Sequence, residues 1–235
     1  MIRAVAHVAL AVLWIAVIAG LLALGTWQVQ RRAWKLDLIA RVDARLKAPP
    51  VPAPALADTE DAYSRVSATG RFLPGKDSFV QASTVQGPGW WVMTPLRVEA
   101  LGDKRAPRTI LINRGYVAER RAAPVPTERV TITGLLRLTE PKGGFLRSND
   151  PVAQRWHSRD VAAIAARQGL TDTAPYFIDA DAAGNAPGQP VGGLTVVKFP
   201  NSHLVYAITW YVLAMMTAAG FYYWITLVRR RGRPA

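Results

Sequence analysis

The chain has 235 residues, half of them hydrophobic, and a formal net charge of +13 at pH 7. It contains three histidines and no cysteine, which excludes disulfides, thiolate metal sites and a cysteine nucleophile. Hydrolase, P-loop and dinucleotide-binding motifs are absent from the sequence, so we expect a protein that is not an enzyme and has no catalytic residues.

The positive charge is spread unevenly along the chain. Residues 28–200 hold 24 Lys and Arg side chains together with all 16 acidic ones. The remaining positive charges are Arg3 and the arginines of a basic tail, residues 229–235. A basic surface attracts nucleic acid, anionic lipid or an anionic ligand. Because the sequence has no nucleic-acid recognition motif, we expect membrane lipids as partners and no nucleic acid.

Two long apolar stretches lie near the ends of the chain, at residues 4–27 and 203–228. Each is long enough to cross a hydrocarbon core about 30 Å thick. A cleaved signal peptide is the alternative for the first stretch, but its apolar region usually has only about 7–15 residues. The sequence therefore predicts two transmembrane helices.

Small residues four positions apart occur in both stretches, a spacing that lets helices approach closely. The two helices can use them to pair with each other or with another membrane protein, and the sequence does not separate these alternatives. The pairs are Ala16 with Gly20, Ala19 with Ala23, and Ala214 with Ala218.

Two spans place both termini on the same side of the membrane. The positive-inside rule assigns the basic tail to the cytoplasm and the central domain to the outer side. Arg31, Arg32 and Lys35, which follow the first span, oppose this assignment. Long loops, however, cross the membrane largely regardless of their charge.

The central region begins with a helical extension at 28–47 and a Pro-rich linker at 48–57. Residues 58–199 contain short apolar runs separated by turns, which is typical of strands. One predicted hairpin covers 71–83, and one helix is capped by Ser158 and ended by Gly169. We expect a small β-rich α+β domain, an antiparallel barrel or sandwich, between the two helices.

Some residues in this domain have two interpretations. Adjacent Trp90 and Trp91 point to opposite faces of a strand, so one fills the core and the other meets membrane or a partner, unless both are core residues. Asp150, Asp160 and Asp179 are interpreted as turn and cap residues rather than as an acidic site.

Five motifs in this order resemble the Surfeit locus (Surf/Shy) family of cytochrome c oxidase assembly factors. They cover nearly the whole chain, and one departure is Tyr116, where the family more often has tryptophan. The motifs are LGTWQVQRRAWKLDLI (24–39), GPGWWVMTPL (87–96), ILINRGYV (110–117), EPKGGFLRSNDP (140–151) and PNSHLVYAITWYVLA (200–214).

The resemblance implies a function in maturing the haem a-containing large subunit of an aa3-type oxidase. The protein would receive haem a from haem a synthase and present it to that subunit. No Arg-rich amphipathic targeting segment precedes the first span, which favours a bacterial inner membrane with a periplasmic domain. The alternatives are a lasting stoichiometric oxidase or supercomplex subunit, and a haem-free scaffold that stabilises an assembly intermediate.

The resemblance also implies that His203, at the start of the second span, is the axial ligand of haem a. Asn201 or Ser202 can cap that helix and place His203 in its first turn. The alternative is an interfacial polar residue that simply stays hydrated.

Four further residues are expected at this site. Tyr206 and Trp210 follow His203 by three and seven positions, so they share its face and can flank a flat macrocycle. Arg31 and Arg32 leave the first span on the same side of the membrane, where guanidinium groups can pair with haem propionates.

Overall fold

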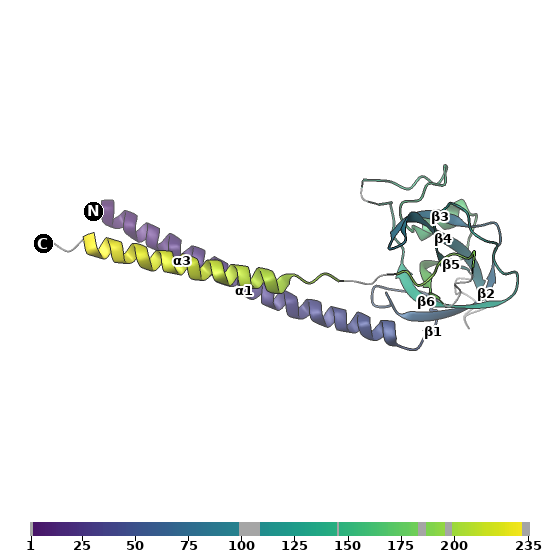
Figure 1. Ribbon diagram of the computed structural model, residues 1–235, viewed down its shortest axis with the longest axis horizontal. Helices are drawn as coiled ribbons and strands as arrows, with labels where there is room; N and C mark the ends of the chain where they lie inside the picture. The colour runs from purple at the N-terminus through teal and green to yellow at the C-terminus, as the bar shows by residue number, and fades with distance from the viewer. Residues whose placement is uncertain (1, 99–108, 145, 183–186, 196–198, 232–235) are drawn as a thin grey trace. The chain divides into compact units, whose positions relative to one another are not determined.

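The computed structural model describes residues 2–98, 109–144, 146–182, 187–195 and 199–231 (Figure 1). The chain divides into two compact units. One combines residues 1–41 with 198–235, and the other comprises residues 42–197. The first is a helix pair and the second is a β-rich domain.

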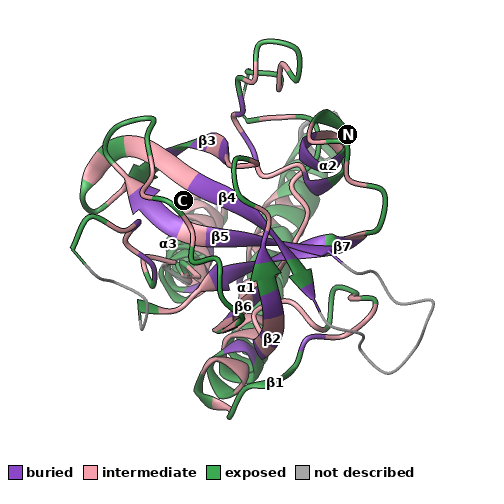
Figure 2. Cartoon of the chain, turned by 90° about the vertical axis from the view of Figure 1, so that its right-hand side faces the viewer, coloured by how far each residue is buried: buried purple, intermediate pink, exposed green. Residues whose placement is uncertain are grey.

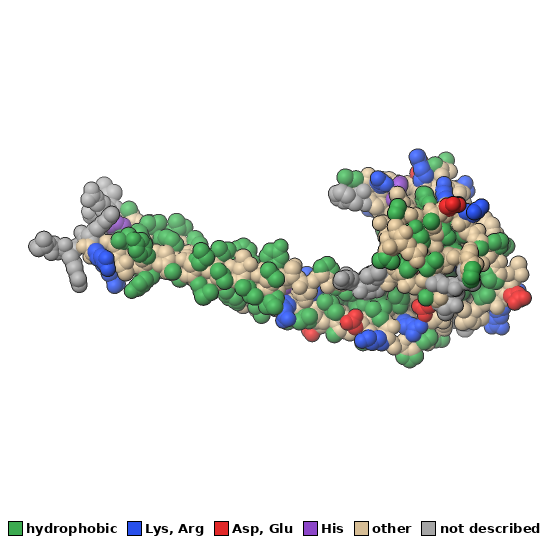
Figure 3. Space-filling view, viewed as in Figure 1, with side chains coloured by type: hydrophobic (Ala, Val, Ile, Leu, Met, Phe, Trp, Pro, Cys, Tyr) green, Lys and Arg blue, Asp and Glu red, His purple; other side chains and the backbone are tan. Residues whose placement is uncertain are grey.

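The helix pair consists of α1 (Ile2–Lys47) and α3 (His203–Arg231), and both helices are long and apolar enough to cross a membrane. They run antiparallel, since His7 contacts Trp224 near one end while Gln28 contacts His203 near the other. α1 ends where Pro49 and Pro50 follow, because proline has no N–H for the helical hydrogen bond. Apolar side chains cover most of the visible face of the paired region (Figure 3).

The two helices meet along a seam whose positions alternate three and four residues apart, the spacing of a coiled coil. These positions are buried or half-buried, whereas most of their neighbours are exposed. On α1 the seam positions are 11, 14, 18, 21, 25, 28, 32 and 35, and on α3 they are 203, 207, 210, 214, 217, 221, 224 and 228.

The small residues at the helix contact are mostly not the ones singled out in the sequence. Gly25 lies on the seam, and a Cβ added there would be 2.8 Å from a ring carbon of Tyr211. Ala207 and Ala214 are also buried. Ala16, Ala19, Gly20, Ala23 and Ala218 are exposed, so of the two alternatives they do not serve contact between these two helices.

The β-rich domain is a closed, barrel-like sheet. Strand order is β1-β2-β6-β7-β5-β4-β3, and a further β2–β4 pairing closes the circuit. β2 has three partner strands, since Arg65–Gly70 pairs with β6, Gly70–Phe72 pairs with β4, and Val66 and Ser67 pair with β1. The strands are β1 (Val51–Pro52), β2 (Arg65–Phe72), β3 (Ser78–Thr84), β4 (Gly87–Val98), β5 (Thr109–Val117), β6 (Val130–Leu138) and β7 (Thr173–Ala180).

Two features of the sheet differ from the sequence-based expectation. The sheet is mixed, because β5 and β7 are parallel, as are β1 and β2. The predicted hairpin at 71–83 is wrong: β2 pairs with β1, β6 and β4, whereas β3 pairs with β4. Gly75 does form the expected turn, with φ of 71°, but the turn redirects the chain between non-neighbouring strands.

Alternation along the strands divides the core into two clusters, one on each face of the sheet. Figure 2 shows buried residues along β4, β5 and β7. Ile110 and Ile112 of β5 belong to the first cluster, and Leu111 between them belongs to the second. The second cluster includes the fully buried Trp156, which precedes α2 (Val161–Arg167), and Ile164, which lies within it. This helix therefore covers one outer face of the barrel. The barrel therefore has apolar packing on both faces of its central strands.

The caps of α2 correct one prediction and agree with another. Asp160, not Ser158, is the N-cap, and its carboxylate accepts a hydrogen bond from the Ala163 N–H. Ser158 instead donates its hydroxyl to the Glu140 carbonyl. Gly169 follows the C-cap with φ of 66°, which suits a helix stop.

Candidate functional site

His203 is the first residue of α3 and lies on the seam of the helix pair. Its Nδ1 is 2.7 Å from Oε1 of Gln28 in α1. Because an amide oxygen only accepts hydrogen bonds, the imidazole donates from Nδ1 in this arrangement. In the neutral ring the other nitrogen, Nε2, then carries the lone pair that a metal ion requires. This arrangement is compatible with ligation of a metal through Nε2.

A second interhelical hydrogen bond lies next to this pair. The Tyr211 hydroxyl is 3.1 Å from the Thr26 hydroxyl, and Thr26 also donates to the Leu22 carbonyl. The ring of Tyr211 fits against Gly25, which leaves room for it by having no side chain. Small contact residues and interhelical hydrogen bonds are the two means by which membrane helices associate. The helices are therefore held closely at the level of His203.

The four other residues expected at this site differ in how far they are buried and in whether they lie on the seam. Trp210 is half-buried on the seam, two turns along α3 from His203, whereas Tyr206 is 53% exposed. Arg32 is on the α1 seam one turn beyond Gln28. Arg31 is exposed, and its guanidinium stacks 4.0 Å from the ring centroid of Trp34. The structure thus brings His203, Trp210 and Arg32 onto one seam and leaves the other two outside it.

Gln28 is the residue that the sequence analysis missed. A signal was present, since a three-four spacing that includes Gly25 continues through Gln28 to Arg32 and Lys35. That pattern places Gln28 on the helix face that contacts a partner. It does not identify the partner residue, because the register between two helices is set by both of them.

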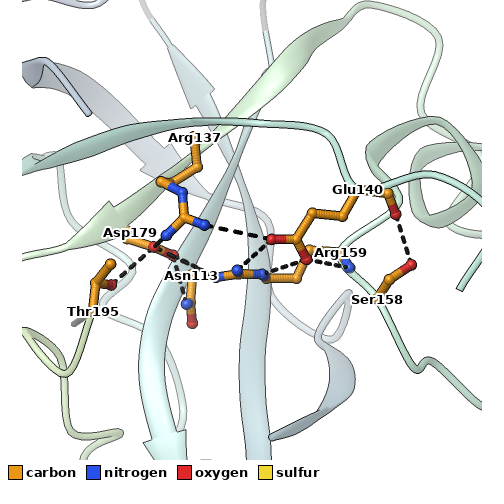
Figure 4. Close-up of polar contacts among 7 residues, drawn as sticks. All are labelled: Asn113, Arg137, Glu140, Ser158, Arg159, Asp179 and Thr195. Atoms are coloured by element: carbon orange, nitrogen blue, oxygen red, sulfur yellow. Dashed lines mark hydrogen bonds and ion pairs between the residues drawn. The ribbon is translucent and has the colours of Figure 1, made fainter. Parts of the chain in front are cut away.

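The β-rich domain holds a separate cluster of buried polar groups (Figure 4). Its centre is Asp179 of β7, which is 3% exposed and accepts hydrogen bonds from Asn113, Arg137, Arg159 and Thr195. Both arginines also pair with Glu140, so this ionic cluster contains two positive and two negative charges. The charges of the cluster balance, and its members are hydrogen-bonded to one another. This arrangement is typical of a structural role, in which the cluster links the barrel strands to the segments that follow them.

The pKa values reflect how tightly the ionic cluster is bound. Burial alone would raise the pKa of the Glu140 carboxyl, but the hydrogen bonds and charge of Arg159, together with Arg137, hold it below its ordinary value. Burial alone would lower the pKa of Arg159, but Asp179 and Glu140 raise it instead. The charged forms of Glu140 and Arg159 are therefore stabilised in the folded domain.

A cavity of about 450 Å³ lies beside the ionic cluster. Arg137, Arg159, Thr195 and the half-buried Trp91 contribute to its wall. Trp91 meets Tyr116 edge-on, with ring centroids 6.4 Å apart. Among the described residues that line this cavity, both arginines are already paired with carboxylates, so neither offers an unneutralised charge to an anionic ligand.

Comparison with known proteins places the chain clearly. The model of the family described as the SURF1 family matches residues 15–215. The chain is 37% identical to Surfeit locus protein 1 of Rattus norvegicus, over 88% of this chain and 72% of that protein. The chain is also 37% identical to Surfeit locus protein 1 of Homo sapiens, over 83% of this chain and 70% of that protein. A SURF1-like protein of Monosiga brevicollis is 34% identical to it, over 89% of this chain and 84% of that protein. With a match that runs from within the first apolar helix, through the β-rich domain, into the second apolar helix, the chain belongs to the SURF1 family.

Proposed function

We propose that this protein is an assembly factor for an aa3-type cytochrome c oxidase, which binds haem a and aids its insertion into the large oxidase subunit. Family membership supports an assembly role. The observation that carries the haem proposal is the state of His203. Its Nδ1 donates to Gln28, so Nε2 is left with a free lone pair in the first turn of α3.

The residues around His203 fit a haem ligand set. Imidazole is a common protein ligand of haem iron, and the chain has no cysteine to offer instead. Haem a, when bound, would supply an iron that accepts the Nε2 lone pair and two propionates that require cationic partners. The exposed ring of Tyr206 and the half-buried ring of Trp210 supply apolar surface on the same helix.

Arg31 and Arg32 are proposed to hold the propionates. They lie about one helical turn beyond Gln28 on α1, the residue that contacts His203. Replacing both, as Arg31→Ala with Arg32→Ala, should weaken haem a retention and leave the ligand-field spectrum unchanged, because the axial ligand is intact. A changed axial spectrum in that variant would contradict the assignment.

The proposed setting is a bacterial inner membrane that α1 and α3 cross, with both termini in the cytoplasm and the barrel domain in the periplasm. The basic tail supports this orientation. A cytoplasm-only fluorescent reporter fused after the last residue should be active, and a periplasm-only enzyme inserted in the 48–57 linker should be active too. The reverse pattern would overturn the orientation.

Deletion of the gene tests the function most broadly. Loss of the protein should lower aa3-type oxidase activity and the haem a content of the large subunit, and should spare oxidases that contain only haem b. The wild-type gene supplied in trans should restore both. An aa3 oxidase made with full haem a content in the deletion strain would contradict the proposal. Stoichiometric recovery of the protein with mature oxidase would favour a permanent subunit, and purification without haem would favour a scaffold.

A further inference from the structure

The hydrogen bond between Gln28 and His203 joins residues 175 positions apart in sequence. Both lie on the seam, and both are half-buried. The contact is therefore part of the packed face of the helix pair rather than a chance encounter of exposed side chains. It also lies at the end of the uncharged stretch of α1, about one turn before Arg31 and Arg32.

In the amide orientation of the structure, Gln28 presents an acceptor oxygen to Nδ1, and this favours one tautomer of the neutral ring. With the amide oxygen towards the ring, Nδ1 must hold the hydrogen and Nε2 the lone pair. With the amide turned round, Nδ1 would have to accept, the proton would move to Nε2, and that nitrogen could not bind iron. Partners that hydrogen-bond the non-ligating nitrogen of a histidine orient the ring and increase its basicity.

We propose that Gln28 is a positioning residue for His203, which holds the imidazole in the tautomer with a free Nε2 before haem a arrives. The inference rests on the proposed function for its purpose, but the tautomer itself is a property of the protein alone. The nearby helix contacts make the arrangement firm, because Gly25, Thr26 and Tyr211 fix the two backbones less than a full turn from Gln28 along α1.

The tautomer can be measured without haem. The full-length protein carrying His7→Gln and His157→Gln retains His203 as its single histidine, so ring-¹⁵N labelling in lipid nanodiscs reports on that residue. At an alkaline pH that keeps imidazole neutral, the spectrum should show a protonated Nδ1 and an unprotonated Nε2. Gln28→Leu should shift the population towards the Nε2-protonated form. Gln30→Leu is the matched control, since Gln30 is exposed on the same helix.

Titration with ferric haem a measures the consequence. Gln28→Leu should weaken binding about 10- to 100-fold, the usual effect of removing such a partner. Gln28→Glu keeps an acceptor at the same place, so it should retain binding and lower the reduction potential of the bound haem by making the ring a stronger donor. The control Gln30→Leu should match the wild type in both respects.

The outcomes separate this inference from the function on which it rests. A wild-type ring protonated at Nε2, or a tautomer unchanged by Gln28→Leu, would overturn the inference. Equal haem a affinity of wild type and Gln28→Leu would also overturn it and leave the proposed function standing. A wild-type protein that binds no haem a would overturn the haem proposal and the ligand-positioning role together.

Discussion

Removing the charge of Asp179 should destabilise the barrel strongly, because its carboxylate is the centre of the ionic cluster. Asp179→Asn keeps the size of the side chain but presents N–H donors to groups that are themselves donors. Hydrogen bonds from Asn113 at 2.7 Å, Arg137 at 3.0 Å, Thr195 at 2.9 Å and Arg159 at 3.2 Å would be lost or weakened. The arginine side chains are only 17% and 13% exposed, so water can replace the carboxylate only in part. Breaking a buried ion pair on one side costs about 3–5 kcal/mol of unfolding free energy.

Asp181→Asn is the matched control for this change. Asp181 lies two residues away and pairs with Arg65 at 2.7 Å, but both side chains are 31% exposed. An ion pair this accessible contributes at most about 1 kcal/mol. The two variants of the full-length protein in detergent can be compared by hydrogen exchange of the β6 and β7 amides. A loss of about 3 kcal/mol corresponds to more than a hundredfold faster exchange. If Asp179→Asn exchanges no faster than Asp181→Asn, the cluster does not brace the barrel.

Two further predictions concern the helix pair and the effect of acid. Gly25→Leu should push the helices apart because its side chain would occupy the place of the Tyr211 ring, whereas Gly20→Leu should be tolerated because nothing lies within 4 Å of the Cβ position there. Spin labels on the two helices would measure the separation, and equal distances in both variants would contradict the packing. The lowered pKa of Glu140 means that its pairing with Arg159 stabilises the fold fully above about pH 4.5 and is lost as the pH falls through the lower, folded-state pKa. Glu140→Gln should therefore be less stable than wild type at pH 7 and lose less stability as the pH falls below about 4.5 in denaturant titrations, whereas parallel pH curves would refute this.

Local sequence patterns predicted where helices begin and end better than they predicted which strands pair with each other. The apolar stretches and the proline-rich stop gave both long helices, and Gly169 correctly marked the end of α2, because these depend on nearby residues. The hairpin at 71–83 was wrong because pairing depends on strands far along the chain, as in the β2–β6 register. The parallel β5–β7 pair follows from the same long-range topology.

Residues that act through distant contacts were the hardest to recognise. Asp179 was interpreted as a turn or cap residue, since a lone aspartate gives no sign that two buried arginines will meet it. Asp160 was interpreted similarly and does cap a helix, because that interaction spans three residues. Gln28 was missed because its partner lies 175 residues away. His203 was found only through the family motif in which it stands.

The most direct test of the central claim is the haem a content and absorption spectrum of the full-length protein purified from cells that make haem a, compared with His203→Ala. The wild type should carry haem a with a Soret band. His203→Ala should carry less, with a shifted spectrum for the remainder and unchanged abundance of the protein in the membrane. Wild-type haem a content and an unchanged spectrum in His203→Ala would show that this histidine is only an interfacial polar residue.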